Sequence, residues 1–472
     1  MVIKNNIKIK NFGPIKEADI GIAPLTIFVG PNSSGKSYSA LLIHSLLNPF
    51  NRNPPNLFHN FSLKSVDFLL DNNRELFDEY NEKLLNYFDS KPDFYDEPFI
   101  FPEKKFSQLI QEGAGKYYEY VVERKIKDNF SNDLNKLNNI INREDFILSF
   151  NNVELKNEKG KLKIKNFSRG DDDDNEDHGE MILSVENDGE NVLITLNYMA
   201  LFEITKKREI LPAFIYGLLS EALFYNLKQN SYYIPASSYR IYYDFNSYLA
   251  DEINGSVKPS TLEKELLANL LDNKNSNKSP FYDLANEMSN EILNSNLIFD
   301  NDVSEEIKLV DDRYDVEFDF SLVSSSVKEL SSLIKYLKDE LEIGDTLILE
   351  EPENHLHPEN QRILVKYLVK SVNIGLNIIL TTHSDYILEQ FNNLIRLGKV
   401  NEDKLNELGY SEDNVLNHEV VKIYNFKKES DYLYVPKEVE VNETGFIDEN
   451  FSEITDELYN ESVDIIESME RD

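Results

Sequence analysis

A glycine-rich segment near the N-terminus has the residue types and spacing of a phosphate-binding loop. It follows the pattern Gly-x-x-x-x-Gly-Lys-Ser and reads Gly30-Pro31-Asn32-Ser33-Ser34-Gly35-Lys36-Ser37. The apolar run 26–29 predicts a buried strand before the loop, and residues 38–47 predict a helix after it. In that context the glycines let backbone N–H groups turn toward phosphate oxygens, and the helix N-terminus adds partial positive charge. The segment therefore predicts a site for a nucleoside triphosphate.

Two side chains of this loop have separate predicted roles. Lys36 is expected to reach the β- and γ-phosphates, and the Ser37 hydroxyl is expected to bind Mg²⁺. The alternative is a surface turn ahead of a helix, but such a turn requires neither the lysine nor the buried strand. The residues expected to contact the nucleotide are Gly30, Pro31, Asn32, Ser33, Ser34, Gly35, Lys36, Ser37 and Tyr38.

Acidic partners for a metal and a water molecule occur far along the chain. The apolar run 346–349 predicts a strand buried on both faces, and it ends in Glu350 and Glu351. Ligands of open α/β sheets bind at this carboxyl end. We expect Glu350 to hold Mg²⁺ directly or through water, and Glu351 to orient or deprotonate the attacking water. The alternative is an ordinary acid-rich first turn of a helix.

A second buried strand ends in a polar cluster that contains a histidine. Residues 377–380 are apolar after the first position, and Thr381-Thr382-His383-Ser384 follow. Parallel strands bring their carboxyl ends to one sheet edge, so His383 is expected beside Glu350 and Glu351. There it would hydrogen-bond the γ-phosphate or the attacking water. A lone histidine is more often structural, and this alternative stays open.

The order of these motifs resembles the ABC-type ATPases of the SMC/RecF/OLD (overcoming lysogenization defect) group, which includes bacterial and archaeal anti-phage ATPases. The resemblance covers about 1–50 and 320–425, plus a Tyr-Ile-Pro-Ala element near 232–240. It implies an α/β fold, namely a P-loop ABC-type ATPase head with a mixed sheet and helical insertions, that uses ATP and Mg²⁺. The residues that follow the acidic strand and carry the resemblance read Glu350-Glu351-Pro352-Glu353-Asn354-His355-Leu356-His357-Pro358.

The resemblance also implies a signature loop that reaches the nucleotide bound to a second copy of the chain. Ser324, Ser325 and Ser326 occupy its place, and Ser326 stands where the family usually has glycine. A Cβ at that position hinders close approach to phosphate, which predicts slower hydrolysis. Arg240 matches a family arginine to which no role is assigned. About fifty residues follow position 425, too few for the Toprim nuclease domain of OLD proteins, so no nuclease is expected in this chain.

Composition restricts the partners and the location. The chain has 85 acidic and 49 basic residues and a net charge of −36, which repels nucleic acid unless a local basic patch exists. It has no cysteine, which excludes disulfides, thiolate catalysis and cysteine-based metal sites. No apolar run approaches the ~18 residues needed to cross a bilayer. We therefore expect a cytoplasmic protein with no membrane contact.

The predicted division of the chain alternates ATPase parts with insertions. Alternating residues around Gly13 and Pro14 predict a hairpin that leads into the phosphate-loop strand. The predicted parts are ATPase lobe I with the phosphate loop (1–50), a helical insertion (51–145), an antiparallel sheet returning to lobe I (146–240), a second helical insertion (241–307), lobe II with signature, acidic strand and His383 (308–425), and an acidic tail (426–472).

Three functions fit these features. The first is an ATP-gated switch in which two heads dimerise around ATP and the insertions pass the motion to a separate nuclease, a toxin or DNA, with an anti-phage role implied by the resemblance alone. The second is a transporter ATPase bound to a membrane partner, which the long insertions and the His-Leu-His-Pro element disfavour. The third is a scaffold that binds ATP without hydrolysing it, which Ser326 favours.

Overall fold

A computed structural model describes the parts of the chain that carry the predicted motifs. The longest described stretches are 6–47, 230–236, 278–299 and 322–446. The shorter ones are 99–102, 147–150, 161–163, 182–187, 191–197, 262, 266, 307–311, 316–319, 457, 459–463, 465–466 and 468–469. The chain divides into two compact units, the first formed by 1–47, 127–152 and 229–472, and the second by 48–126 and 153–228.

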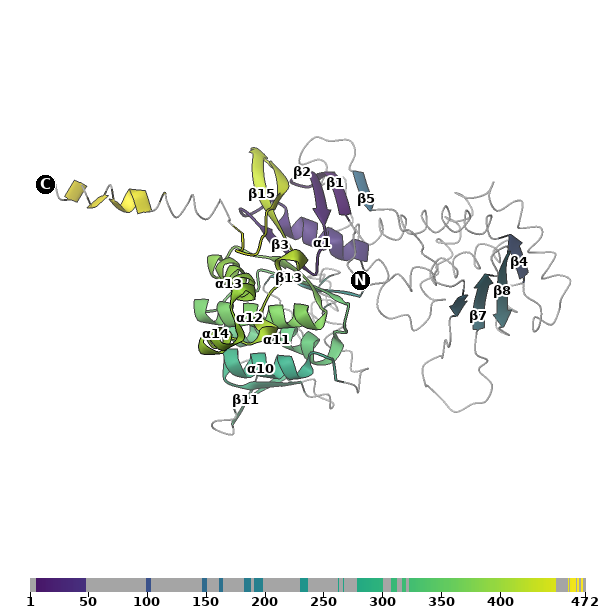
Figure 1. The fold of residues 1–472 in the computed structure, drawn as a ribbon, viewed down its shortest axis with the longest axis horizontal. Coiled ribbons are helices and arrows are strands. Elements are labelled where there is room, and N and C mark those ends of the chain that lie inside the picture. Colours follow the sequence, from purple (N-terminus) through teal and green to yellow (C-terminus); the bar gives the residue numbers. More distant parts are fainter. Residues whose placement is uncertain are drawn as a thin grey trace, which may run out of the picture. The chain divides into compact units, whose positions relative to one another are not determined.

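The first unit is built on a nine-stranded mixed sheet (Figure 1). The strand order is β5-β1-β2-β16-β15-β3-β14-β13-β9. Parallel pairs join β9, β13, β14, β3 and β15, whereas β1 pairs antiparallel with β2 and β5, and β15 with β16. The bounds are β1 (Asn6–Phe12), β2 (Ile15–Gly21), β3 (Leu25–Val29), β5 (Ile147–Phe150), β9 (Ser231–Ile234), β13 (Thr346–Glu350), β14 (Asn377–Thr381), β15 (Val421–Ser430) and β16 (Leu433–Val439).

Helices cover both faces of the central strands, which explains why those strands are apolar without alternation. Leu347 and Leu349 of β13 belong to the core shared with α10 to α13, while Ile348 points to the opposite face and is buried as well. On that face α1 packs on β14, β9 and β13. The predicted α/β class with a mixed sheet is confirmed. The helices are α1 (Lys36–Leu47), α10 (Tyr282–Leu293), α11 (Ser325–Lys335), η3 (Tyr336–Glu340), α12 (Pro358–Ile374), α13 (Asp385–Arg396), η4 (Leu397–Lys399), α14 (Glu402–Glu407), η5 (Glu412–Asn414) and η6 (His418–Val420).

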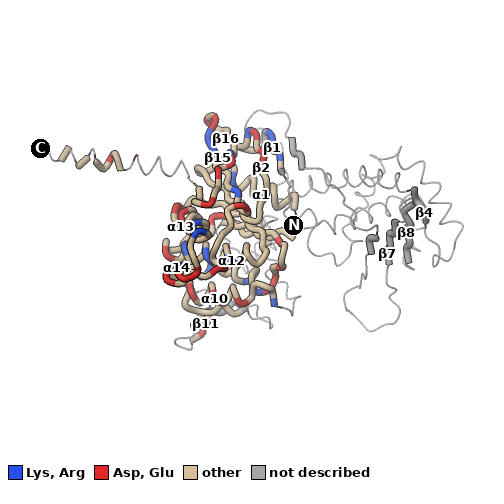
Figure 2. The backbone as a smooth tube through the Cα atoms, viewed as in Figure 1, with Lys and Arg blue, Asp and Glu red and all other residues tan. Residues whose placement is uncertain are grey.

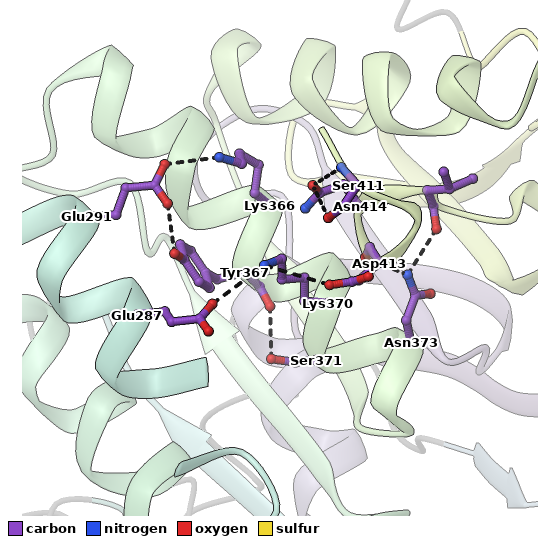
Figure 3. A network of polar contacts seen from close by, with 11 residues as sticks. Glu287, Glu291, Lys366, Tyr367, Lys370, Ser371, Asn373, Ser411, Asp413 and Asn414 are labelled. Carbon is purple, nitrogen blue, oxygen red and sulfur yellow. Dashed lines mark hydrogen bonds and ion pairs between the residues drawn. The ribbon is translucent and has the colours of Figure 1, made fainter. Parts of the chain in front are cut away.

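Helix α12 is the long helix between the two motif-bearing strands β13 and β14. It begins at Pro358, whose missing N–H is not needed at a helix start, and it ends at Gly375 with φ +119°. Figure 3 shows its side chains directed at α10: the Glu291 carboxylate accepts from Lys366 Nζ at 3.0 Å and from Tyr367 Oη at 2.7 Å. Lys370 lies 3.6 Å from the Glu287 carboxylate. These polar contacts fix α12 against α10.

Two smaller sheets complete the described elements. In the first unit β10 (Asn296–Phe299), β11 (Ile307–Asp311) and β12 (Val316–Asp319) form an antiparallel sheet. The second unit contains an antiparallel sheet with the order β4-β8-β7-β6. Its strands are β4 (Phe99–Pro102), β6 (Lys161–Lys163), β7 (Ile182–Asn187) and β8 (Asn191–Asn197). Within the described stretches no helix has the length and apolar character needed to span a bilayer.

The structure adds strands and pairings to three parts of the predicted division of the chain. The antiparallel sheet expected within 146–240 is divided: β5 pairs with β1 in the large sheet, whereas β7 and β8 belong to the second unit. Both predicted helical insertions contain strands, β4 in 51–145 and β10 in 241–307. The boundary at 425 falls inside β15, and the sheet continues through β16 to Val439. Partners far away in the sequence decide the pairing of β5 with β1 and of β4 with β8, and local patterns do not carry that information. The helices expected in 51–145 lie outside the described residues.

Candidate functional site

The phosphate loop joins β3 to α1 in a backbone conformation that its glycines permit. Gly30 and Gly35 have φ values of +139° and +104°, and Ser33 is also left-handed at +59°. A Cβ on Gly30 would lie 3.0 Å from the Phe426 carbonyl oxygen on β15, and one on Gly35 would lie 2.9 Å from Ile15 Cγ1. Both glycines are therefore required by conformation and by close packing.

Lys36 folds back onto the loop. Its Nζ donates to the carbonyl oxygens of Gly30 at 3.0 Å and Pro31 at 2.8 Å. Burial lowers the pKa of Lys36 to about 8, although the charges of Glu351, Glu353 and Glu350 oppose that shift. The amine from one end of the chain thus lies within electrostatic reach of three carboxylates from the other end. Of the remaining loop residues, Pro31, Asn32, Ser33 and Ser37 are exposed, Ser34 is buried, and Tyr38 packs edge-on against Phe12.

Glu350 ends β13 in a buried environment. Burial raises its pKa, and hydrogen bonds from Ser37, Tyr233 and the Ala236 N–H partly offset that rise. The Ala236 N–H lies 3.4 Å from Glu350 Oε2, while Oε1 is buried without a hydrogen-bond partner. A carboxylate oxygen that lacks a partner, beside a serine hydroxyl, fits a hard cation such as Mg²⁺. Among the described residues no group of three or more His, Asp and Glu side chains is arranged to hold a metal ion.

Glu351 and His383 meet between the ends of β13 and β14. Glu351 Oε1 lies 3.5 Å from His383 Nε2, and Oε2 accepts from Asn354 Nδ2 at 3.3 Å. The hydrogen bond from His383 is the main reason that the pKa of Glu351 is lowered. Glu351 has a φ of +44°, a strained backbone for a residue with a Cβ. The carboxylate is therefore held ionised and partly exposed, which suits a group that orients or accepts a proton from water.

Two residues that the motifs did not identify support this arrangement. Tyr233 of β9 is buried and hydrogen-bonds Glu350. Glu353 Oε1 accepts from Thr382 Oγ1 and from the His383 N–H, both at 2.7 Å. The Tyr-Ile-Pro-Ala element and the third glutamate of the Glu-Glu-Pro-Glu run were the available signals, but neither pattern indicates which group the residue would contact.

The serines predicted as a signature loop form the start of α11. Ser324 caps the helix by accepting from the Val327 N–H at 3.5 Å, and Ser325 is exposed. Ser326 Oγ donates to the His355 carbonyl at 2.8 Å, so Ser326 contacts the loop that follows β13. Lys36, Ser37, Glu350, Glu351 and His383 thus gather at one sheet edge, and the three serines lie at a separate helix start. Arg240 is outside the described residues.

Solved structures similar to this chain include SMC head domains. One from Thermotoga maritima has 12% identity and a TM-score of 0.32, with 93% of this chain and 100% of that chain covered. An SMC head bound to the C-winged helix domain of ScpA has 12% identity, a TM-score of 0.35 and coverages of 93% and 97%. One bound to the C-terminal domain of ScpA, from Pyrococcus furiosus, has 10% identity, a TM-score of 0.31 and coverages of 96% and 98%. TM-scores of this size do not by themselves establish a common fold.

No curated protein matches the chain. The profile of the AAA ATPase domain family, however, matches residues 1–388 of the 472. The match spans the phosphate loop, both acidic positions and His383. The chain therefore belongs to the AAA ATPase domain family.

Proposed function

We propose that this chain binds ATP with Mg²⁺ at the shared edge of β3, β13 and β14 and hydrolyses it. The observation that carries the proposal is that Lys36 of the phosphate loop lies close enough to Glu350, Glu351 and Glu353 for their charges to raise its pKa against the effect of burial. A buried amine beside a cluster of carboxylates is suited to bind a triphosphate and a divalent cation together, because each charge then gains a partner.

Each residue would have one task during hydrolysis. Lys36 would leave the Gly30 and Pro31 carbonyls and donate to the β- and γ-phosphates, while the N–H groups of the loop surround the phosphate oxygens. Ser37 and Glu350 would hold Mg²⁺, which neutralises phosphate charge. Glu351 would take the proton of the attacking water, and His383 would position that water or the γ-phosphate.

The ATP-dependent dimer is the second part of the proposal. The exposed Ser324 and Ser325 at the N-terminus of α11 offer hydroxyl and backbone N–H groups to the nucleotide of a second copy. ATP would then hold two heads together, and hydrolysis would release them. A role in anti-phage defence with a separate effector is supported by the resemblance of the motifs alone.

Direct binding of DNA is not part of this proposal. Figure 2 shows Lys and Arg in blue interspersed with Asp and Glu in red around α12, α13 and α14. Several of these basic groups are paired, such as Arg396 with Glu389 at 2.6 Å on α13 and Lys404 with Glu407 at 2.8 Å on α14. Paired cations on an acidic chain attract phosphate backbones weakly.

Turnover of ATP by the purified full chain tests the hydrolysis proposal. Lys36→Ala should abolish nucleotide binding, and Glu351→Gln should abolish turnover but retain binding. Glu359→Gln is the matched control, because Glu359 is exposed in the first turn of α12 and should leave turnover unchanged. Light scattering of Glu351→Gln with and without ATP tests the dimer. Normal turnover in both Lys36→Ala and Glu351→Gln would refute the site.

A scaffold that binds ATP without hydrolysing it remains the second candidate. The favouring observation is the Ser326 hydroxyl, which occupies the start of α11 and is already bonded to the His355 carbonyl. A single-turnover assay of the wild-type chain with bound ATP distinguishes the hydrolysing enzyme from the scaffold. Conversion to ADP supports the enzyme, and ATP that persists unchanged supports the scaffold.

A further inference from the structure

Glu353 is a carboxylate next to the candidate site that has no assigned task. It lies in the turn between β13 and α12, and burial raises its pKa. Its Oε1 receives two short hydrogen bonds, from Thr382 Oγ1 and from the His383 N–H, both at 2.7 Å. Oε2 is buried without a hydrogen-bond partner. Removing a carboxylate oxygen from water is costly, and here the other oxygen atom makes the contacts that offset the cost.

These contacts hold the end of β14 from two sides. Thr382 Oγ1, which donates to Glu353, also accepts from the Ser384 N–H at 3.0 Å. The Ser384 hydroxyl in turn donates to Gln361 Oε1 on α12, and Ser384 caps α13 by accepting from the Ile387 N–H. The backbone on both sides of His383 is therefore anchored, and Glu353 is the anchor that bonds the His383 N–H directly.

The same turn carries Glu351, whose side chain meets the His383 imidazole. Glu351 and Glu353 are two residues apart, and they contact the side chain and the backbone of one histidine. The left-handed φ of +44° at Glu351 shows that this turn is constrained. A shift of the end of β14 would separate the 3.5 Å pair, so the position of His383 depends on the Glu353 contact.

We propose that Glu353 is a positioning residue that sets the orientation of His383 toward Glu351 and the reacting phosphate. The inference rests on the proposed ATPase function. The proposal requires an acceptor oxygen at the position of Glu353 Oε1. That oxygen must lie within hydrogen-bond distance of both the Thr382 hydroxyl and the His383 N–H.

A competing explanation is that Glu353 contributes only negative charge near Lys36. Two substitutions separate these explanations. Glu353→Gln keeps an acceptor oxygen at the right distance and removes the charge. Glu353→Asp keeps the charge and shortens the side chain by one methylene, which withdraws the oxygen from its two donors.

The experiment measures kcat and the ATP dissociation constant of the full chain for both variants, with Glu359→Gln as control. We expect Glu353→Asp to lower kcat by about 10- to 100-fold, the range found for residues that orient a functional group, with ATP affinity changed less than about threefold. Glu353→Gln should keep kcat within about threefold of the wild type. The reverse order, with Asp active and Gln inactive, would overturn the proposal in favour of charge.

A double-mutant cycle tests whether the effect passes through His383. In the His383→Ala background, Glu353→Asp should lower kcat by less than about twofold, because the residue that it positions is gone. An unchanged 10- to 100-fold effect in that background would overturn the proposal.

Amide hydrogen exchange of the 381–386 segment gives a readout that needs no turnover. Exchange should rise in nucleotide-free Glu353→Asp and remain at the wild-type level in Glu353→Gln. If the wild-type chain does not hydrolyse ATP, the proposed function fails, and this exchange pattern still reports whether Glu353 anchors the segment. Equal exchange in all variants would overturn the anchoring.

Discussion

Glu351 Oε1 lies 3.5 Å from His383 Nε2, and the two side chains come from the ends of adjacent parallel strands. The pairing holds a carboxylate and an imidazole together at the sheet edge that faces the phosphate loop. It also favours the ionised form of Glu351, because a hydrogen bond from the histidine stabilises the charge.

Removing the histidine should therefore alter the rate and its pH dependence. We expect His383→Ala to lower kcat by about 100-fold, a loss typical of a group that positions the reacting atoms. Without the hydrogen bond the pKa of Glu351 rises, so the acidic limb of the pH–rate profile should move to higher pH. Steady-state kinetics from about pH 3.5 to 9 would measure both, because the lowered pKa of Glu351 places the wild-type acidic limb below pH 5. A lower rate with an unmoved acidic limb would contradict the coupling between these two residues.

Nucleotide binding should weaken in alkaline solution because of Lys36. Burial lowers its pKa to about 8, so the charged amine that binds phosphate is lost as pH rises above that value. We expect ATP affinity, measured by calorimetry in EDTA, to be nearly constant below pH 8 and to fall by up to about tenfold per pH unit above it.

Lys36→Arg is the control for this titration, since a guanidinium stays charged throughout the range. Whatever the absolute affinity of Lys36→Arg for ATP, that affinity should not change with pH in the range where the affinity of the wild type declines. Parallel profiles for the two proteins would assign the decline to a different group.

Two adjacent tyrosines provide a matched test of the metal site. Tyr233 hydrogen-bonds Glu350, whereas the Tyr232 hydroxyl donates to the Glu340 carbonyl at 2.6 Å. We expect Tyr233→Phe to raise the Mg²⁺ concentration for half-maximal turnover by about tenfold, because Glu350 loses a group that orients it. Tyr232→Phe removes a hydroxyl from the same strand and should leave the Mg²⁺ dependence unchanged. Equal effects of the two substitutions would indicate a general loss of packing around β9.

Gly30→Ala should weaken nucleotide binding and lower stability together. The added Cβ meets the Phe426 carbonyl at 3.0 Å in a residue with φ +139°, so the loop or β15 must move. We expect a stability loss of about 1–3 kcal/mol together with at least tenfold weaker ATP binding. Gly409→Ala is the control, since Gly409 has φ +77° but no atom within 4 Å of an added Cβ. Gly409→Ala should lower stability but leave the affinity for ATP unchanged. Thermal unfolding and ATP titration would measure these two quantities.

The contact between α10 and α12 should contribute to stability in a pH-dependent way. We expect Tyr367→Phe to cost about 1 kcal/mol near neutral pH, because the Glu291 carboxylate loses its 2.7 Å hydrogen bond. Burial raises the pKa of Glu291, but the bonds from Tyr367 and Lys366 outweigh that effect and the net pKa is lowered. The stabilisation is thus present above the unfolded-state pKa and is lost as pH falls through the lower folded-state value.

Thermal unfolding at several pH values would measure this difference. Tyr432→Phe, at an exposed position in the turn between β15 and β16, should leave the melting temperature unchanged. A Tyr367→Phe deficit of the same size at pH 3 and pH 7 would contradict the role of the Glu291 charge.

The local patterns of the sequence predicted the strands and helices around the site well. The hairpin around Gly13 and Pro14 is formed by β1 and β2, and the runs at 346–349 and 377–380 form β13 and β14. Such elements can be predicted from consecutive residues. A continuous apolar run indicates a strand buried on both faces, and local residue types indicate where a helix begins and ends. The predicted boundary at 425 lies within β15, whose first half is mostly buried and whose last residues are exposed.

The sequence alone determined the phosphate loop, the acidic strand end and the mixed α/β class, because each depends on short runs of residues. Only the tertiary structure decided that β5 joins β1, that Tyr233 reaches Glu350, and that Glu353 binds the backbone of His383. These are contacts between segments distant in the chain. Such contacts depend on how the whole unit buries its apolar side chains and pairs its hydrogen-bonding groups. No single stretch of sequence contains that information.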